Sequence, residues 1–250
     1  MGEGARDWPA GYARHVFDVL DSTLSEAARI APTLTGPAWI MAVEQTAARG
    51  RRGRAWSTPR GNFAGTLIMR HTGAPAHAAL RSFTTSLALR DAFVEVTGRA
   101  DAFALKWPND VLLNGGKVAG ILLETSGDHL VIGIGVNLSH APGADQVEAR
   151  ALTPVSLSGE TGVQVAPQVF LDALARAFDR YETQFTTYGF APIRTAWLSH
   201  AARRGQVVTA RTMRDETIGV FEDVDDAGNL ILGTPKGRVA ITAADVYFDD

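Results

Sequence analysis

The residues best suited to anion binding form a short arginine-rich segment, residues 49–54, with the sequence Arg-Gly-Arg-Arg-Gly-Arg. Arginine guanidinium groups bind phosphate and carboxylate oxygens in pairs, and glycine lets the backbone bend around an anion. An apolar run at 39–43 comes shortly before it, so we expect a loop that follows a buried strand. Such a loop fits a small, multiply charged ligand such as a nucleotide. The alternatives are a solvated basic loop or a nucleic-acid-binding patch.

A second group of candidate residues comes from residues 106–110, Lys-Trp-Pro-Asn-Asp, and from Lys117. Lys106 is expected at a strand end, where Pro108 restricts the neighbouring backbone and keeps the lysine in a defined place. An ordinary turn with a solvated lysine is the alternative. Residues 133–137, Gly-Ile-Gly-Val-Asn, indicate either a bulged strand with its terminal turn or a flat backbone surface that admits a ligand.

Composition excludes several classes of function. The 250 residues carry a formal net charge of −3, which excludes general nucleic-acid binding and makes the arginine segment a local feature. With 46% hydrophobic and 20% charged residues, a sizeable core is expected. The absence of cysteine excludes disulfides, thiolate metal sites and cysteine nucleophiles, and it fits a reducing compartment. Neither a signal peptide nor a membrane span is predicted, so we expect a cytoplasmic location.

The elements that must position these residues are strands and helices in an irregular order. Strands are predicted at residues 15–20, 39–43, 62–69, 103–105, 111–113, 118–124 and 130–136. Helices are predicted at 24–31, at 76–96, from about 166, and at 191–202. Thr23 and Glu26 have the spacing of a capping box for the first helix, and Asn114-Gly115 predicts a hairpin turn.

The chain is predicted to divide into two domains at Arg203-Arg204-Gly205. Residues 1–202 would form the catalytic, ligand-binding domain, and residues 203–250 a small β module with several tight turns. The mixed order of elements predicts an α+β fold with a mixed, mainly antiparallel sheet and packed helices.

Five segments, in their order along the chain, resemble the biotin protein ligases, or biotin–[acetyl-CoA carboxylase] ligases. They are residues 21–23, 45–54, 106–110, 116–121 and 133–137. The ordered set is specific although no single segment is, and the resemblance covers about residues 15–140. It implies the class II synthetase-like catalytic fold of that family, with a small SH3-like β-barrel module at the C-terminus.

The resemblance implies an ATP-dependent, AMP-forming ligase that works in two steps. The biotin carboxylate attacks the α-phosphate of ATP, giving biotinyl-5′-AMP and pyrophosphate. A lysine on the biotin carrier domain of a carboxylase then attacks the mixed anhydride. Mg²⁺ is expected to accompany ATP, without assigned protein ligands. The cations of the chain suit this chemistry, because carboxylate and triphosphate repel each other.

Individual roles also follow from the resemblance. The implied catalytic residues are Lys106, Arg49 and Arg51. The implied biotin-binding residues are Ser22, Thr23, Gln45, Arg49, Gly50, Arg51, Lys106, Gly120, Gly133 and Gly135. The implied ATP-binding residues are Arg52, Arg54, Trp56, Asn109, Lys117 and Asn137. The side chains of Ser22, Thr23 and Gln45 would hold the ureido ring of biotin. Gly120, Gly133 and Gly135 would leave room for its ring and chain, and Trp56 and Asn137 would contact the adenine of ATP.

Two positions depart from the family pattern. Leu24 stands where the family usually has asparagine, which either removes a polar contact near biotin or adds an apolar wall. Ala48 replaces the glycine that usually opens the loop, and it narrows the backbone freedom there. Because strand-like sequence begins by His15, we expect a monofunctional ligase with no N-terminal DNA-binding domain and no sequence-specific DNA binding.

Two other functions remain as alternatives. Lipoate or octanoate ligases and transferases share the fold and the carrier-lysine chemistry, but their glycine-rich loop is of a different type. A non-catalytic nucleotide- or nucleic-acid-binding module would leave Lys106 and residues 133–137 without a shared role. Both a monomer and a homodimer paired through an exposed sheet edge fit the sequence.

Overall fold

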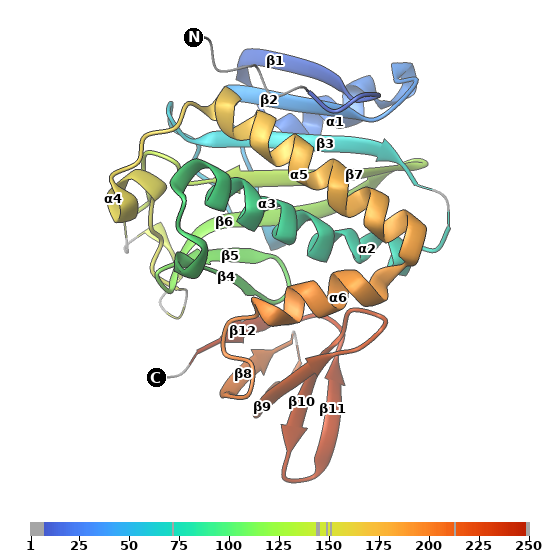
Figure 1. The fold of residues 1–250 in the computed structure, drawn as a ribbon, viewed down its shortest axis with the longest axis vertical. Coiled ribbons are helices and arrows are strands. Elements are labelled where there is room, and N and C mark those ends of the chain that lie inside the picture. Colours follow the sequence, from blue (N-terminus) through green and yellow to red (C-terminus); the bar gives the residue numbers. More distant parts are fainter. Residues whose placement is uncertain are drawn as a thin grey trace.

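The computed structural model describes residues 8–71, 73–143, 146–148, 150, 152–212 and 214–248, which form two sheets with packed helices (Figure 1). The large sheet contains β1 (Ala13–Leu20), β2 (Ala38–Gln45), β3 (Phe63–Arg70), β4 (Phe103–Lys106), β5 (Asp110–Leu113), β6 (Gly116–Ser126) and β7 (His129–Val136). The small sheet contains β8 (Val207–Arg211), β9 (Glu216–Val224), β10 (Leu230–Thr234), β11 (Gly237–Ile241) and β12 (Asp245–Tyr247). The helices are α1 (Thr23–Ile30), α2 (Pro75–Ala79), α3 (Arg81–Thr97), α4 (Leu157–Thr161), α5 (Pro167–Tyr188) and α6 (Phe190–Ser199), with 3₁₀ turns at Ala31–Thr33, Arg51–Gly53 and Ala100–Ala102.

The large sheet has the strand order β1-β2-β3-β7-β6-β5-β4. Strands β1 and β2 pair in parallel, and the remaining neighbours pair antiparallel. The predicted hairpin between β5 and β6 is present, with positive φ at Asn114 and Gly115. The predicted α+β class with a mainly antiparallel sheet is therefore confirmed.

Alternate residues of β2 face two different sets of helices, as the twofold period of a strand requires. Trp39 and Met41 belong to the main core, which α3 and α5 cover. Ala38 and Ile40 belong to a smaller core under α1, together with Leu24. Figure 1 shows α3 and α5 crossing one face of the sheet. The opposite face, under α1, is the one that carries the candidate site.

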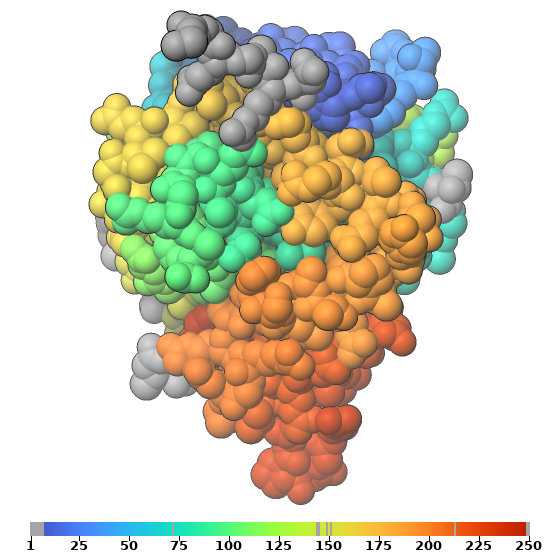
Figure 2. Space-filling view, in the orientation of Figure 1, coloured from blue at the N-terminus to red at the C-terminus, as the bar shows by residue number. Residues whose placement is uncertain are grey.

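The small sheet joins the large one through buried tryptophans. The indole Nε1 of Trp107 donates a hydrogen bond to the carbonyl oxygen of Gly228 at 3.0 Å. Trp197 of α6 packs against Phe221 of β9, with ring centroids 6.4 Å apart. In the space-filling view the C-terminal segment projects from one end of the molecule (Figure 2). These contacts bring β12 to the edge of the candidate site. The predicted division at residue 203 stays a prediction.

Two predictions about helices are wrong. The helix expected at 76–96 is divided at Leu80, whose carbonyl accepts a bond from the amide of Phe83 at 3.0 Å in a tight turn. The capping box does not form, because Ser22 is the N-cap and its side chain makes no capping bond. Thr23 is the first helical residue, and its side chain bonds to β2 instead. None of the helices in the described part of the chain is both long and apolar enough to cross a membrane.

Candidate active site

A cavity of about 620 Å³ opens over the face of the large sheet that carries α1. Its walls come from the turn before α1, from residues 48–56 (the arginine loop), from the β4–β5 turn, and from β6, β7 and β12. Every predicted site residue except Arg52 lines it: Ser22, Thr23, Gln45, Arg49, Gly50, Arg51, Arg54, Trp56, Lys106, Asn109, Lys117, Gly120, Gly133, Gly135 and Asn137.

One end of the cavity is a neutral hydrogen-bonding network. The side-chain oxygen Oε1 of Gln45 accepts bonds from the amide and hydroxyl of Thr23, at 2.7 and 3.1 Å. Thr66 donates to the Thr23 hydroxyl at 2.8 Å, and the Gln45 amide donates to Thr58 at 3.1 Å. These groups are held in fixed orientations by one another. They suit the recognition of a neutral polar ring rather than a charge.

The other end holds two lysines on a shared carboxylate. The Nζ of Lys117 lies 2.6 Å from Asp110 Oδ1, and the Nζ of Lys106 lies 3.8 Å from Asp110 Oδ2. Burial lowers the pKa of Lys106, against the opposing attraction of Asp110. Burial alone would raise the pKa of Asp110, but Lys117 and Lys106 outweigh it and hold the pKa below its usual range. Two lysine side chains therefore share one buried carboxylate at this end of the cavity.

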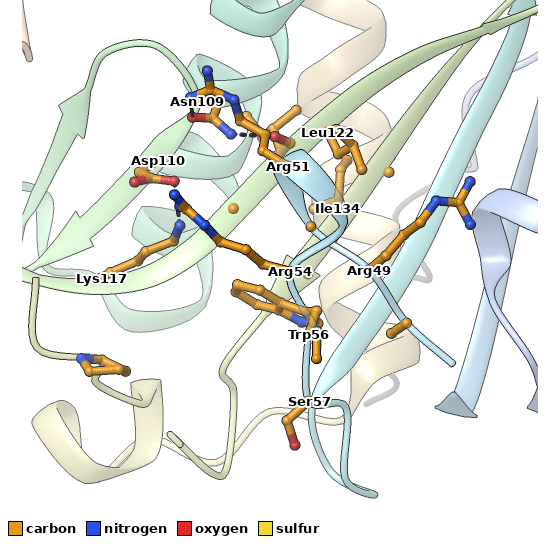
Figure 3. Close-up of a pocket in the computed structure, with 18 of the residues that line it drawn as sticks. Arg49, Arg51, Arg54, Trp56, Ser57, Asn109, Asp110, Lys117, Leu122 and Ile134 are labelled. Atoms are coloured by element: carbon orange, nitrogen blue, oxygen red, sulfur yellow. Dashed lines mark hydrogen bonds and ion pairs between the residues drawn. The ribbon is translucent and has the colours of Figure 1, made fainter. Parts of the chain in front are cut away.

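The arginines of the loop pair with three carboxylates, Glu124, Asp245 and Glu148, the last at 2.8 Å from Arg54. Arg49 pairs with Glu124 of β6 at 2.8 Å and points away from the lysine cluster (Figure 3). Arg52 and Arg54 pair with Asp245 of β12 at 2.7 and 3.0 Å. Arg52 does not line the main cavity, although its partner Asp245 does. The predicted phosphate loop is therefore docked onto the small sheet.

Arg51 is the arginine that reaches toward the lysine end. Its Nη1 donates to Asn109 Oδ1 at 3.4 Å and lies 3.6 Å from Asp245 Oδ1. Asn109 is itself fixed by a bond from its amide to the carbonyl of Ile121 at 2.6 Å. The structure thus brings Arg51, Lys106 and Lys117 around Asp110, and leaves Arg49 apart from them.

Glycines of β6 and β7 make room for two side chains of the protein itself. A Cβ atom at Gly135 would lie 2.4 Å from the indole of Trp56, and one at Gly133 would lie 2.8 Å from Leu24. Lys117 lies over the Trp56 ring, with its Nζ 5.7 Å from the centroid. The space expected for biotin above Gly133 and Gly135 is thus taken by Leu24 and Trp56 in this structure. Leu24 forms an apolar wall, one of the two alternatives weighed for this position.

Asn137 presents an unpaired acceptor to the cavity. Its side chain is 2% exposed, and its amide donates to the carbonyl of Val155 at 3.1 Å. Among the residues that the structure describes, its Oδ1 has no hydrogen-bond partner. A buried acceptor without a partner is costly, and a ligand amino group would satisfy it.

The backbone of the arginine loop is unusual at Arg52 rather than at Ala48. Arg52 has φ +58° and Gly53 has φ +73°. Ala48 keeps an ordinary φ, and its carbonyl accepts a bond from the amide of Trp56 at 3.1 Å. Alanine at position 48 is therefore compatible with this loop conformation.

The described residues contain no group of three or more histidine, cysteine or acidic side chains that could hold a metal. Asp110 and Asp245, the carboxylates nearest the cationic end, already face lysines and arginines. The donor set does not fit a dedicated Mg²⁺ site, so we derive no step through a protein-bound metal.

Comparison with known proteins agrees with this geometry. Residues 16–137 match the Biotin/lipoate A/B protein ligase family, and residues 205–249 match the Biotin protein ligase C terminal domain. A Biotin--[acetyl-CoA-carboxylase] ligase of Paracoccus denitrificans is 56% identical over 233 residues, which cover 91% of this chain and 97% of that protein. This chain belongs to the biotin protein ligase family. The match of residues 205–249 extends the similarity to the small sheet. The five sequence segments that resemble the family all lie before that sheet.

Other members of the biotin protein ligase family are more distant. The Bifunctional ligase/repressor BirA of Bacillus subtilis is 31% identical over 239 residues, which cover 92% of this chain and 72% of that protein. The biotin protein ligase of Aquifex aeolicus, solved in complex with biotin and ATP, has a TM-score of 0.83 at 22% identity, covering 94% and 97% of the two chains. That likeness shows a shared fold.

Several residues that shape the site were not predicted. Asp110 lies in the 106–110 segment, four residues after Lys106, but the local sequence does not indicate that it contacts both lysines. Glu124 and Asp245, the partners of the arginine loop, gave no local signal because they lie far away in sequence. Thr58 and Thr66 were missed for the same reason.

Proposed function

We propose that this member of the biotin protein ligase family activates biotin with ATP and transfers it to a lysine of a carboxylase biotin carrier domain. In the first step a biotin carboxylate oxygen attacks the α-phosphorus of ATP, and pyrophosphate leaves. In the second step the carrier lysine amine attacks the acyl carbon of biotinyl-5′-AMP. An amide forms, AMP leaves, and the amine loses its proton.

The proposal rests on how the polar groups divide along one cavity. Biotin has a neutral ureido ring at one end and a carboxylate at the other. The Thr23–Gln45 network offers neutral donors and acceptors, while Lys106 and Lys117 lie at the cationic end. Leu24 supplies apolar surface between them, which suits an aliphatic chain.

In the proposed first step the protein acts mainly by charge and position. Lys106, Lys117 and Arg51 would bring the carboxylate and the α-phosphate together by offsetting their repulsion. Lys106 can follow negative charge as it moves between oxygens, because an ammonium binds as a compact point charge. Asp110 orients both lysines without touching the reactants. Arg49 would join only after leaving Glu124, so its assigned role requires loop movement.

Asn137 and Trp56 support the proposed binding of ATP. The unpaired Oδ1 of Asn137 can accept a bond from the exocyclic amino group of adenine. The indole of Trp56 lies against Gly135 of β7, two residues before Asn137, and offers a flat surface there. Mg²⁺ would arrive on the phosphates of ATP. We expect the reaction in the cytoplasm, and the absence of cysteine fits that compartment.

The convergence of two lysines and Arg51 beside a neutral recognition network is the observation that carries the proposal. The purified protein should be incubated with Mg-ATP and, separately, with biotin, lipoate or octanoate, and the acyl-adenylate measured by mass spectrometry. We expect biotinyl-AMP in the biotin sample alone. Lipoyl- or octanoyl-AMP would assign the chain to the alternative activity, and no adenylate would contradict both.

A further inference from the structure

A second cavity, of about 500 Å³, adjoins the first on the side of the small sheet. Arg54, Glu148 and Asp245 line both cavities. The second cavity is also lined by Arg52 of the arginine loop and by Arg211 at the end of β8. Arginines from three segments far apart in sequence, the third represented by Arg150, therefore meet at one hollow.

The charges around this cavity are only partly balanced. Asp245 pairs with Arg52 and Arg54, and Glu148 pairs with Arg54 at 2.8 Å. Arg211 lies directly opposite Asp245 in the β8–β12 pairing, so both side chains lie on one face of the sheet. Within the described part of the chain, Arg211 makes no ion pair.

Carboxylates reduce the positive charge without cancelling it. Arg211 also lies opposite Glu216 in the β8–β9 pairing, and Glu216 pairs with Arg150 at 3.3 Å. Four arginines and two carboxylates line the cavity, and Glu216 stands outside the lining. A compact anion that accepts several guanidinium bonds would find a positive hollow here.

We propose that this second cavity binds the diphosphate leaving group, that is, the β- and γ-phosphates of the nucleotide and then free pyrophosphate. The proposal rests on the proposed function, because that reaction releases pyrophosphate. Attacking and leaving oxygens lie roughly in line at the reacting phosphorus. With biotin bound at the Thr23 end, the leaving group departs toward the arginine loop and the small sheet.

This assignment gives the small sheet a direct part in the first step. Arg211 stabilises the negative charge that grows on the diphosphate as the bond to the α-phosphorus breaks. Asp245 holds Arg52 and Arg54 at the rim until phosphate oxygens replace its own. An acidic protein surface is less suited to this site, because the arginines converge on a hollow rather than on a flat face.

The test is a calorimetric titration of sodium pyrophosphate into the full chain, and separately of AMP. Arg211→Gln should weaken pyrophosphate binding about tenfold, the value of a good charge-assisted bond. AMP binding should change less than twofold, because AMP lacks the distal phosphates. The pyrophosphate affinity of Arg211→Lys should lie between that of Arg211→Gln and that of the unmodified chain. The matched control is Arg238→Gln, which removes an arginine of the same sheet that pairs with Glu222.

The outcomes separate this inference from the proposed function. Equal pyrophosphate binding in Arg211→Gln and Arg238→Gln would overturn the inference, as would an equal loss of pyrophosphate and AMP binding. Undetectable binding to the unmodified chain would overturn it as well. The adenylate assay on the unmodified chain is scored separately. No biotinyl-AMP beside an Arg211-dependent pyrophosphate site would sink the proposed function and keep the anion site.

Discussion

At the scale of single residues, Lys106 is the side chain whose environment is most specialised. It is 8% exposed, lies near Asp110, and has its Nζ 5.5 Å from the Phe248 ring. A buried ammonium is costly unless it is paired and hydrogen-bonded. Asp110 is shared with Lys117, whose Nζ lies 2.6 Å from Oδ1, so one carboxylate serves two lysines in one cavity.

Replacing Lys106 by methionine should abolish adenylate formation while biotin binding stays detectable. Methionine keeps most of the side-chain volume but removes the charge that would bridge carboxylate and phosphate. Adenylation is measured by mass spectrometry and biotin binding by calorimetry. Lys236→Met, in the turn between β10 and β11, is the matched control. Near-normal adenylation by Lys106→Met would show that the assigned role is wrong.

The lowered pKa of Lys106 predicts an alkaline loss of activity. Because burial lowers that pKa below the ordinary lysine value of 10.5, kcat/KM for adenylation should fall as pH rises toward it. Stability should move the other way. In the same window the unfolded chain binds more protons at this site, so its contribution to the free energy of unfolding rises with pH. Thermal melts in the same buffers distinguish deprotonation from unfolding.

Residues that are neighbours in the chain could be predicted together from sequence. Lys106 and Asn109 are an example, because one short segment carries both. Asp245 lies far from Arg52 in sequence, yet the two side chains form an ion pair at 2.7 Å. Its proximity depends on the packing of the small sheet against the large one, and no local pattern encodes that packing. The burial of Trp107 and Trp197 is what brings the two sheets together.

At the scale of elements, the arginine loop depends on β12 for its conformation. Arg52, Arg54 and Arg51 approach Asp245 at 2.7, 3.0 and 3.6 Å. The Asp245 side chain is 13% exposed, so solvent screens these pairs less than surface ones. Arg52, whose φ is +58°, contacts Asp245 but does not line the main cavity.

Asp245→Asn should therefore loosen the loop in the free protein. Loss of about 1 kcal/mol of pairing corresponds to about fivefold faster opening. Hydrogen–deuterium exchange of peptides covering residues 49–56 is the measurement. Glu222→Gln breaks the pair with Arg238 on the same sheet and should leave the loop unchanged. Equal exchange in both variants would mean that Asp245 does not hold the loop.

The element boundaries show where sequence patterns lose precision. Thr23 and Glu26 have capping-box spacing, yet the Thr23 hydroxyl bonds to Gln45 of β2 and accepts from Thr66 of β3. A tertiary network thus replaces the local one. At Leu80 the apolar periodicity continues while the backbone turns tightly, so the pattern alone does not reveal the break.

At the scale of the whole molecule, a buried ion pair ties the core to the site. Arg81 at the start of α3 contacts Glu182 of α5 at 2.6 Å, with both side chains 10% exposed. The next residue, Ser82, donates to the carbonyl oxygen of Pro108 at 2.8 Å. The end of α3 that the pair anchors therefore supports the turn that carries Asn109.

Glu182→Gln should lower stability by about 3 kcal/mol, because it leaves the Arg81 charge buried without its partner. For a chain of this size that loss lowers Tm by about 6–12 °C. The control Glu44→Gln removes an exposed pair with Arg60 and should cost about 0–1 kcal/mol. Differential scanning calorimetry measures both.

A double variant separates the effect of charge from that of packing at this ion pair. Arg81→Met with Glu182→Leu removes both charges and keeps apolar volume, so it should recover most of the lost stability. Recovery of Tm together with normal adenylation would show that the pair can be replaced without disturbing the Ser82–Pro108 contact. If Glu182→Gln melts like the unmodified chain, the pair does not anchor α3. Support for the 106–110 turn must then come from the packing of α3 against β4 and β5, which bury Phe103 and Val111 beneath it.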